Sequence, residues 1–290
     1  MKKKFEIDYK ALEICKTGGT DNLLYPLVLA LPHSGKVFPK EFFEMTNLSA
    51  QELRFNEDLY MDDILSPLFD KGMAYVVMNV ARAFIDVNRD QIELDDQMFE
   101  DYPADTMIFE NSRCRSGYGL IHRITASGKN IYKTPLSYDE IQTRIQNVYK
   151  VYHQALAKVI EACRAKFGWC FVLDCHSMPS KICSIMPDSP KIDICLGDLF
   201  LQSCPKELSD EFESVLTKKG YEVLKNVPYS GAYTTFHYCE PRQKIYTMQF
   251  EINRALYADE RNLDKSKNYE KIKADVCAAI LDFAKMLSLK

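Results

Sequence analysis

The chain has 290 residues, of which 47% are hydrophobic and 27% are charged, and its formal net charge is −4. This is the balance of an ordinary globular protein with enough apolar residues for a sizeable core. Nucleic-acid binding is disfavoured because neutralising phosphates requires clustered Lys and Arg, whereas a small acidic substrate needs only a few local basic groups.

The first half of the chain predicts two buried strands and one helix. Residues 27–31 and 74–80 are continuous apolar runs, which are typical of buried strands. Ser49 and Glu52 have the spacing of a capping box, and a helix is expected at about residues 57–69. Residues 86–135 show no clear period. They predict a long loop or short irregular pieces, which inside one domain are usually functional or contain a small hairpin.

The clearest predicted helix covers residues 138–167, where apolar residues follow the three-four spacing of one helix face. Further strands are predicted at 169–173, 192–196, 221–224 and 245–252, and further helices at 205–219 and 268–287. Strand and helix alternate throughout. The chain is therefore expected to form one α/β domain over residues 1–290, with a mixed, largely parallel sheet covered by helices on both faces.

The ten cysteines are scattered and no C-x-x-C occurs, which disfavours a ribbon-type zinc site. The N-terminus carries charges but no apolar signal region, and no apolar stretch has the length of a membrane span. These features predict a cytoplasmic protein with free thiols and no membrane partner.

Short polar motifs stand where apolar runs end, at residues 32–35, 86–89, 174–177 and 249–251. Open α/β proteins place their chemistry at this edge of the sheet. His33 and His176 each follow a predicted buried strand, and together they favour a metal site. His153 lies inside the long helix and is more simply a structural histidine with a satisfied partner, and His122 is uninformative.

A catalytic zinc ion takes three protein ligands and keeps a position open for water. Two histidines leave one place, for which a carboxylate is the usual ligand, and the helix expected after residue 56 offers Glu57, Asp58, Asp62 and Asp63. Asp58 and Asp62 border the apolar face of that helix, where a charge needs a partner. Acids are also favoured at a helix N-terminus without any metal, so both interpretations stay open.

Asp174 precedes His176 by two residues, so both side chains would point to one side of an extended strand. Such a carboxylate could orient a ligand imidazole or be a further ligand. Glu251 ends an apolar run, where glutamate is rare unless it is paired or catalytic. Beside a metal-bound water it could take a proton and pass it to a leaving amine; the alternative is an ion pair with Arg254.

Asn88 and Arg89 are the best candidates for binding a substrate, because the planar guanidinium of Arg can donate two parallel hydrogen bonds to a carboxylate. Arg82 could polarise a scissile carbonyl or hold its oxyanion. The acid-rich residues 90–101 offer both arginines surface ion pairs as an alternative. The sequence has no G-x-S-x-G, H-E-x-x-H, G-x-x-x-x-G-K or G-x-G-x-x-G, which disfavours serine-hydrolase, thermolysin-like, kinase-like and dinucleotide-binding functions.

These motifs, in this order, resemble the N-formylglutamate amidohydrolase family. The similar segments are residues 32–39, 58–62, 81–89, 174–178, 196–204, 228–233 and 249–257, of which 81–89 is the most specific. The family is distantly similar to zinc carboxypeptidases, which also carry an Asp-x-Asn-Arg segment. Lys36 stands where those enzymes have the glutamate of a His-x-x-Glu pair.

The resemblance implies a zinc-carboxypeptidase-like (phosphorylase/hydrolase-like) fold and hydrolysis of a small acidic N-acyl amino acid, most simply N-formyl-L-glutamate to formate and glutamate. It implies one zinc ion per chain and the following roles: His33, His176 and Asp58 (with Asp62 as the alternative) as ligands, Glu251 as general base, Asn88 and Arg89 on the substrate carboxylate, and Arg82 at the oxyanion. Residues 228–233 and His237 are expected near the site without an assigned role. The alternatives are another N-acyl amino acid or a short peptide as substrate, or a metal-binding protein without catalysis.

Overall fold

The computed structural model describes residues 7–101, 103, 109, 111–183 and 192–290. Two compact units are built from interleaved segments of the chain. The first unit comprises Met1–Lys16, Pro32–Glu57 and Met78–Ala155, and the second comprises Thr17–Leu31, Asp58–Val77 and Leu156–Lys290. A single domain over residues 1–290 stays a prediction.

Within the described residues, seven strands form one sheet in the order β1-β3-β2-β4-β7-β5-β6. They are β1 (Cys15–Gly18), β2 (Leu27–Leu31), β3 (Ala74–Met78), β4 (Cys170–Met178), β5 (Ile194–Gly197), β6 (Val223–Lys225) and β7 (Ile245–Asn253). Strand β2 is parallel to β3 and β4, and β4 is parallel to β7. Strand β5 runs antiparallel to β7 and parallel to β6. The expected mixed, largely parallel sheet is confirmed.

The α-helices are α1 (Phe42–Met45), α2 (Ala50–Leu53), α3 (Met61–Leu65), α4 (Ser112–Arg115), α5 (Tyr138–Arg144), α6 (Lys150–Phe167), α7 (Ser180–Cys183), α8 (Lys206–Lys218), α9 (Tyr233–His237) and α10 (Tyr269–Leu287). A π-helical segment, η6 (Ile145–Tyr149), joins α5 to α6, so the helix predicted at 138–167 is confirmed. The 3-10 turns are η1 (Tyr9–Ala11), η2 (Thr20–Asn22), η3 (Arg54–Asn56), η4 (Ser66–Leu68), η5 (Asp96–Met98), η7 (Pro241–Gln243) and η8 (Arg254–Leu256). A separate hairpin pairs β8 (Ala258–Asp259) with β9 (Asp264–Lys265).

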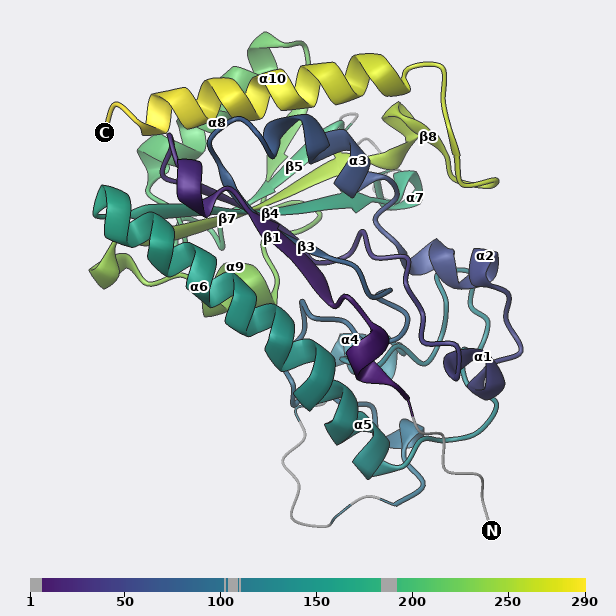
Figure 1. Cartoon of the computed structure of the whole chain (residues 1–290). Helices are drawn as coiled ribbons and strands as arrows, with labels where there is room; N and C mark the ends of the chain where they lie inside the picture. Colours follow the sequence, from purple (N-terminus) through teal and green to yellow (C-terminus); the bar gives the residue numbers. More distant parts are fainter. Residues whose placement is uncertain (1–6, 102, 104–108, 110, 184–191) are drawn as a thin grey trace. The chain divides into compact units, whose positions relative to one another are not determined.

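Helices cover both faces of the sheet in the second unit (Figure 1). On one face, Phe283 of α10 stacks on Phe212 of α8 with 4.5 Å between ring centroids, and it meets the edge of Phe171 of β4. Side chains alternate along a strand, so the neighbouring Cys170 points to the other face. There it contacts Cys163 of α6. The expected layering of helix, sheet and helix is confirmed.

Strand β4 is longer than the predicted strand at 169–173. It pairs with β7 over nine positions, from Cys170↔Ile245 to Met178↔Asn253. Asp174 and His176 therefore lie within β4 rather than after it. In this register His176 is the partner of Glu251, so both side chains project from the same face of the sheet.

The helix predicted at 57–69 begins later than expected. Helix α3 starts at Met61, because Tyr60 has φ 59° and cannot continue a right-handed helix. Glu57 ends the preceding 3-10 turn, where Arg54 Nε donates to its carboxylate at 2.7 Å. Asp58 is thus outside the helix, and its position on a helix face, as argued from the sequence, is wrong. The Ser49 capping box is confirmed at the start of α2.

The region predicted to be irregular, residues 86–135, consists of short pieces where the structure describes it. It contains η5, α4 and isolated bridges between Tyr118 and His122 and between Ile124 and Asn130. All ten cysteines lie among the described residues and are free thiols, as predicted. Among the described helices, none combines the length and the apolar character that a membrane crossing requires.

Replacing Phe283 by Ala should lower the free energy of unfolding by about 3–5 kcal/mol, because a buried aromatic pair is lost and a cavity remains. Leu289→Ala is the control, since Leu289 is 86% exposed and should change stability by less than about 0.5 kcal/mol. Urea denaturation of the purified variants measures both. Equal losses would contradict the packing described for α10.

Candidate active site and metal ligands

Asp86 is the centre of a buried polar cluster in the first unit. Its side chain is fully buried, and its oxygens lie 2.6 Å from Nε2 of His33 and 3.2 Å from Nε2 of His122. Nε of Arg82 and the backbone N–H of Asn88 also donate to it, each at 2.8 Å. Burial alone raises the pKa of Asp86, but the charges of Arg82, His33 and Arg89 outweigh burial and hold the pKa well below its usual value. The Asp86 carboxylate is therefore ionised and fixes the orientation of His33.

His122 is neutral in this cluster. Nδ2 of Asn56 lies 2.7 Å from Nδ1 of His122, so Nδ1 accepts and Nε2 carries the proton that faces Asp86. Burial, the largest cause, lowers the pKa of His122 to about 4 against the opposing effect of Asp86.

Arg89 is buried and held by backbone oxygens. Nε donates to the carbonyl of Tyr118 at 3.1 Å, and Nη1 donates to the carbonyl of Asn88 at 3.0 Å. The Asp86 carboxylate is 3.9 Å from Nε. Arg89 therefore does not form the surface ion pair with residues 90–101 that was the alternative interpretation.

In the second unit, His176 lies between two carboxylates. Nε2 is 3.0 Å from Oδ2 of Asp174, and Nδ1 is 2.9 Å from Oδ2 of Asp58. All three side chains are buried. Burial lowers the pKa of His176, but Asp174 and Asp58 outweigh it and raise the pKa well above its usual value. Asp174 and His176 point to the same side of β4, as the sequence predicted.

Arg254, at the first position of η8, forms its ion pair with Asp58. Nη2 donates to Oδ1 of Asp58 at 2.9 Å and to the carbonyl of Ser177 at 3.0 Å. Nε donates to Oγ of Ser177 at 2.9 Å. The alternative interpretation of Glu251, as the ion-pair partner of Arg254, is therefore not supported.

Glu251 is buried on β7, and its Oε1 accepts a hydrogen bond of 2.6 Å from Nε2 of Gln249. Its Oε2 is buried without a hydrogen-bond partner among the described residues. Burial raises the pKa of Glu251 to about 7, with a further increase from Asp58 and an opposing effect of His176. A carboxyl group of this kind exchanges a proton readily at neutral pH.

His33 in the first unit and Asp58 and His176 in the second unit each offer one buried ligand atom of a type that binds metal ions. Two imidazoles and a carboxylate are a donor set that zinc accepts. Each histidine also has a carboxylate at its other ring nitrogen, Asp86 for His33 and Asp174 for His176, which is how metal-ligating histidines are usually oriented. Asp62, the alternative third ligand, is not part of this group.

The segment at residues 228–233 contacts the strand beside Glu251. Sγ of Cys195 donates to the carbonyl of Tyr229 at 3.2 Å, and Cys195 is the register partner of Glu251 on β5. The backbone N–H of Leu199 donates to the carbonyl of Ser230 at 2.8 Å. This segment therefore contacts β5 at the position paired with Glu251, and its place near an active site stays a prediction.

Two further histidines have contacts of other kinds. Nε2 of His153 lies 2.9 Å from the carbonyl of Val87, which confirms the structural role predicted for His153. His237 is exposed at the end of α9 and stacks on Tyr233, with 4.7 Å between ring centroids.

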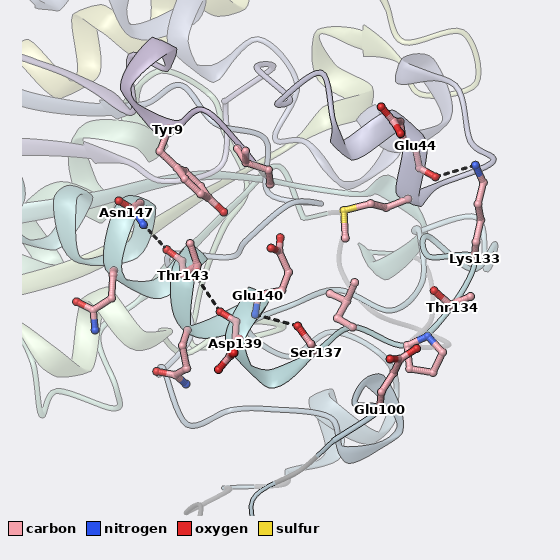
Figure 2. Close-up of a pocket in the computed structure, with 16 residues that line it drawn as sticks. Tyr9, Glu44, Glu100, Lys133, Thr134, Ser137, Asp139, Glu140, Thr143 and Asn147 are labelled. Atoms are coloured by element: carbon pink, nitrogen blue, oxygen red, sulfur yellow. Dashed lines mark hydrogen bonds between the residues drawn. The ribbon is translucent and has the colours of Figure 1, made fainter. Parts of the chain in front are cut away.

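A pocket of about 1320 Å³ lies in the first unit at the start of α5, and Figure 2 shows the residues that line it. Its labelled lining includes Tyr9, Glu44, Glu140 and Asn147, and Nζ of Lys133 donates to the carbonyl of Glu44 at 3.0 Å. None of the residues predicted for catalysis, substrate binding or metal binding lines this pocket.

The residues of these clusters that had no role assigned from the sequence include Asp86, His122 and Arg254. The sequence could have indicated a role for Asp86, because this residue opens the Asp-x-Asn-Arg segment at the end of an apolar run. It gave no indication for His122, since this residue lies in a region without a clear pattern. Arg254 was considered only as a partner for Glu251, three residues away, whereas its actual partner lies 196 residues away in sequence.

A mixed α/β sheet with buried sets of histidine, carboxylate and arginine is compatible with a hydrolase that binds a metal ion. The family model for N-formylglutamate amidohydrolase matches residues 25–258 of the chain. The chain belongs to this family.

Relatives and solved structures agree with this assignment. The N-formylglutamate deformylase of Pseudomonas putida is 25% identical over 238 residues, which cover 81% of this chain and 82% of the relative. The enzyme of that name from Pseudomonas aeruginosa is 24% identical, with coverages of 81% and 83%. The crystal structure of N-formylglutamate amidohydrolase from Ralstonia eutropha JMP134 has a TM-score of 0.88 at 28% identity and covers 95% of this chain and 99% of its own. A protein of Agrobacterium tumefaciens shares the fold, with a TM-score of 0.64 at 16% identity over 96% of this chain and 99% of its own.

His122 should make stability depend on pH. Its pKa of about 4 in the folded chain lies below the usual 6.5, so the unfolded chain binds more protons between these values. Stability is therefore lost as the pH falls from about 6.5 towards 4, by at most about 1.4 kcal/mol per pH unit from this group. His122→Gln should remove this contribution, and His237→Gln, at an exposed position, should retain it. Urea denaturation from about pH 7 to 4.5 measures the slopes; identical slopes for wild type and His122→Gln would refute the expectation.

Proposed function

We propose that the protein is a zinc-dependent hydrolase of N-formyl amino acids and that its substrate is N-formyl-L-glutamate, which it converts to formate and glutamate. The observation that carries the proposal is the family match over residues 25–258, together with the presence in this chain of every chemical group that the reaction needs. The substrate named for the Pseudomonas relatives supports the choice of glutamate. Location in the cytoplasm stays a prediction.

We propose His33, Asp58 and His176 as the metal ligands. The register of the sheet supports this set. Strands β2 and β4 are parallel and pair up to Ala30↔Asp174; His33 follows Ala30 by three residues and His176 follows Asp174 by two. Both histidines thus lie towards the carboxyl ends of paired parallel strands, where α/β proteins place their sites, and this supports the proposed set.

When bound, zinc would lower the pKa of a water molecule to about 7. In the proposed reaction, Glu251 accepts a proton from the attacking water and carries it to the nitrogen of the leaving glutamate. The unpartnered Oε2 of Glu251 supports this role, because a buried carboxylate oxygen needs a donor. Arg82 stabilises the developing negative charge on the formyl oxygen. Asn88 and Arg89 bind a carboxylate of the substrate, to which the planar guanidinium of Arg89 donates.

The direct test is formate release by the purified protein from N-formyl-L-glutamate, N-acetyl-L-glutamate and other N-formyl amino acids, with and without a chelator. The proposal expects N-formyl-L-glutamate to be the best substrate and the chelator to abolish turnover, with recovery on addition of zinc. Bound zinc without turnover of any N-acyl amino acid would instead favour a binding protein.

Glu251→Gln should retain zinc but lose at least about 10²-fold in kcat, as removal of a general base typically does. Metal analysis and formate assays of the same preparation measure both quantities. Glu161→Gln is the matched control, because Glu161 is exposed and pairs with Arg164 on the surface of α6. A variant rate equal to the wild-type rate would remove Glu251 from the mechanism.

Arg89→Lys should raise KM by at least about tenfold and change kcat less, because a single ammonium cannot make the two parallel hydrogen bonds of a guanidinium. Steady-state kinetics with N-formyl-L-glutamate measures the changes in KM and kcat separately. Arg164→Lys is the control. A second assay uses the wild type and an N-formyl amine that lacks the α-carboxylate. If the wild type hydrolyses this compound as fast as N-formyl-L-glutamate, the role of Arg89 is contradicted.

A further inference from the structure

We propose that Arg254 is a positioning residue that holds the Asp58 carboxylate in the orientation of a metal ligand, with Ser177 as its anchor. The proposal rests on the proposed function, in which Asp58 is one of three zinc ligands. Arg254 itself touches neither the substrate nor the metal in this account.

The contacts of Arg254 divide the two oxygens of Asp58 between different partners. Oδ1 accepts from Nη2 of Arg254 at 2.9 Å, and Oδ2 lies 2.9 Å from Nδ1 of His176. The carboxylate therefore cannot rotate without breaking one of these contacts. Oδ2 is the oxygen on the side of the neighbouring ligand, so the hydrogen bond to Oδ1 selects which oxygen is offered to a metal.

Asp58 needs this support because the backbone around it is not held by regular structure. Helix α3 starts only at Met61, and Tyr60 has a left-handed conformation. A second contact from the same C-terminal segment confirms that the region is held from outside, since Oη of Tyr257 donates to the carbonyl of Leu59 at 2.8 Å. Tyr257 thus holds the backbone, and Arg254 holds the side chain.

Charge gives a further reason for an arginine at this position. Asp58, Asp174 and Glu251 are three buried acids of the second unit, grouped around His176. The positive guanidinium of Arg254 lies 2.9 Å from Oδ1 of Asp58, so it offsets part of the repulsion among these carboxylates.

The guanidinium of Arg254 donates hydrogen bonds from two of its nitrogens. Nε donates to Oγ of Ser177, while Nη2 donates both to the Ser177 carbonyl and to Asp58. Ser177 directly follows the proposed ligand His176 on β4. Arg254 therefore ties the strand that carries one ligand to the carboxylate of another. Lysine could keep the charge, but its single nitrogen cannot reproduce this geometry.

The test compares zinc dissociation constants, measured by competition with a chromophoric chelator, for wild type, Arg254→Lys and Ser177→Ala. Arg254→Lys should weaken zinc binding by about 10–100-fold, the usual effect of losing an outer partner of a ligand. Ser177→Ala removes only the anchor at Nε and should weaken binding by about three- to tenfold, as expected for one hydrogen bond. Arg164→Lys, at an exposed ion pair, should leave the constant unchanged.

Kinetics at saturating zinc separates positioning from a substrate role. For Arg254→Lys, KM should remain near the wild-type value once the site is filled. If the metal-free form of Arg254→Lys fails to fold, as judged by thermal unfolding, Ser177→Ala carries the test.

Zinc affinities within about twofold of wild type for both variants, or a raised KM with unchanged zinc affinity, would overturn the role of Arg254. The variant His176→Ala distinguishes a failure of the role proposed for Arg254 from a failure of the proposed metal centre itself. If wild type and His176→Ala bind zinc equally, the proposed ligand set is wrong, whatever the Arg254 variants do.

Discussion

Two buried carboxylates, Asp58 and Asp86, are the groups on which the candidate site depends. Each is in contact with a histidine and an arginine at once: Asp58 with His176 and Arg254, and Asp86 with His33 and Arg82. An isolated buried charge is costly, and a buried pair persists only when its remaining hydrogen bonds are satisfied. The histidines proposed as ligands are therefore oriented by groups that the fold must pair in any case, so their orientation does not depend on a bound metal.

The residues proposed for the chemistry could be predicted from the sequence because they follow or end apolar runs. His33 comes two residues after the end of β2, and Glu251 lies near the end of β7. The sheet order could not be found in the same way. Neither could the partners of Asp58 and Asp86, because hydrogen bonds between segments far apart in sequence leave no local pattern. Arg254 shows this most clearly, since the nearest acid in sequence, Glu251, is not its ion-pair partner.

Two local predictions were wrong for identifiable physical reasons. The helix was expected to begin at residue 57 but begins at Met61, because Tyr60 has a left-handed backbone conformation. The periodic pattern of apolar residues gives no sign of that conformation. The strand expected to end at residue 173 continued to Met178 because its polar residues face a partner strand that is polar at the matching positions, with Asp174 beside Gln249 and His176 beside Glu251. In both cases tertiary contacts overrode the signal from a single segment.

The register between β4 and β7 has a consequence for how such a chain can change. His176 and Glu251 are spaced by backbone hydrogen bonds between two central strands, so their separation is independent of the segments that connect those strands. Insertions in the connections would leave the spacing intact. Deleting one residue in either strand upstream of these positions would turn one of the two side chains to the opposite face. Natural variation in length should therefore collect outside these two strands, while their own lengths stay fixed.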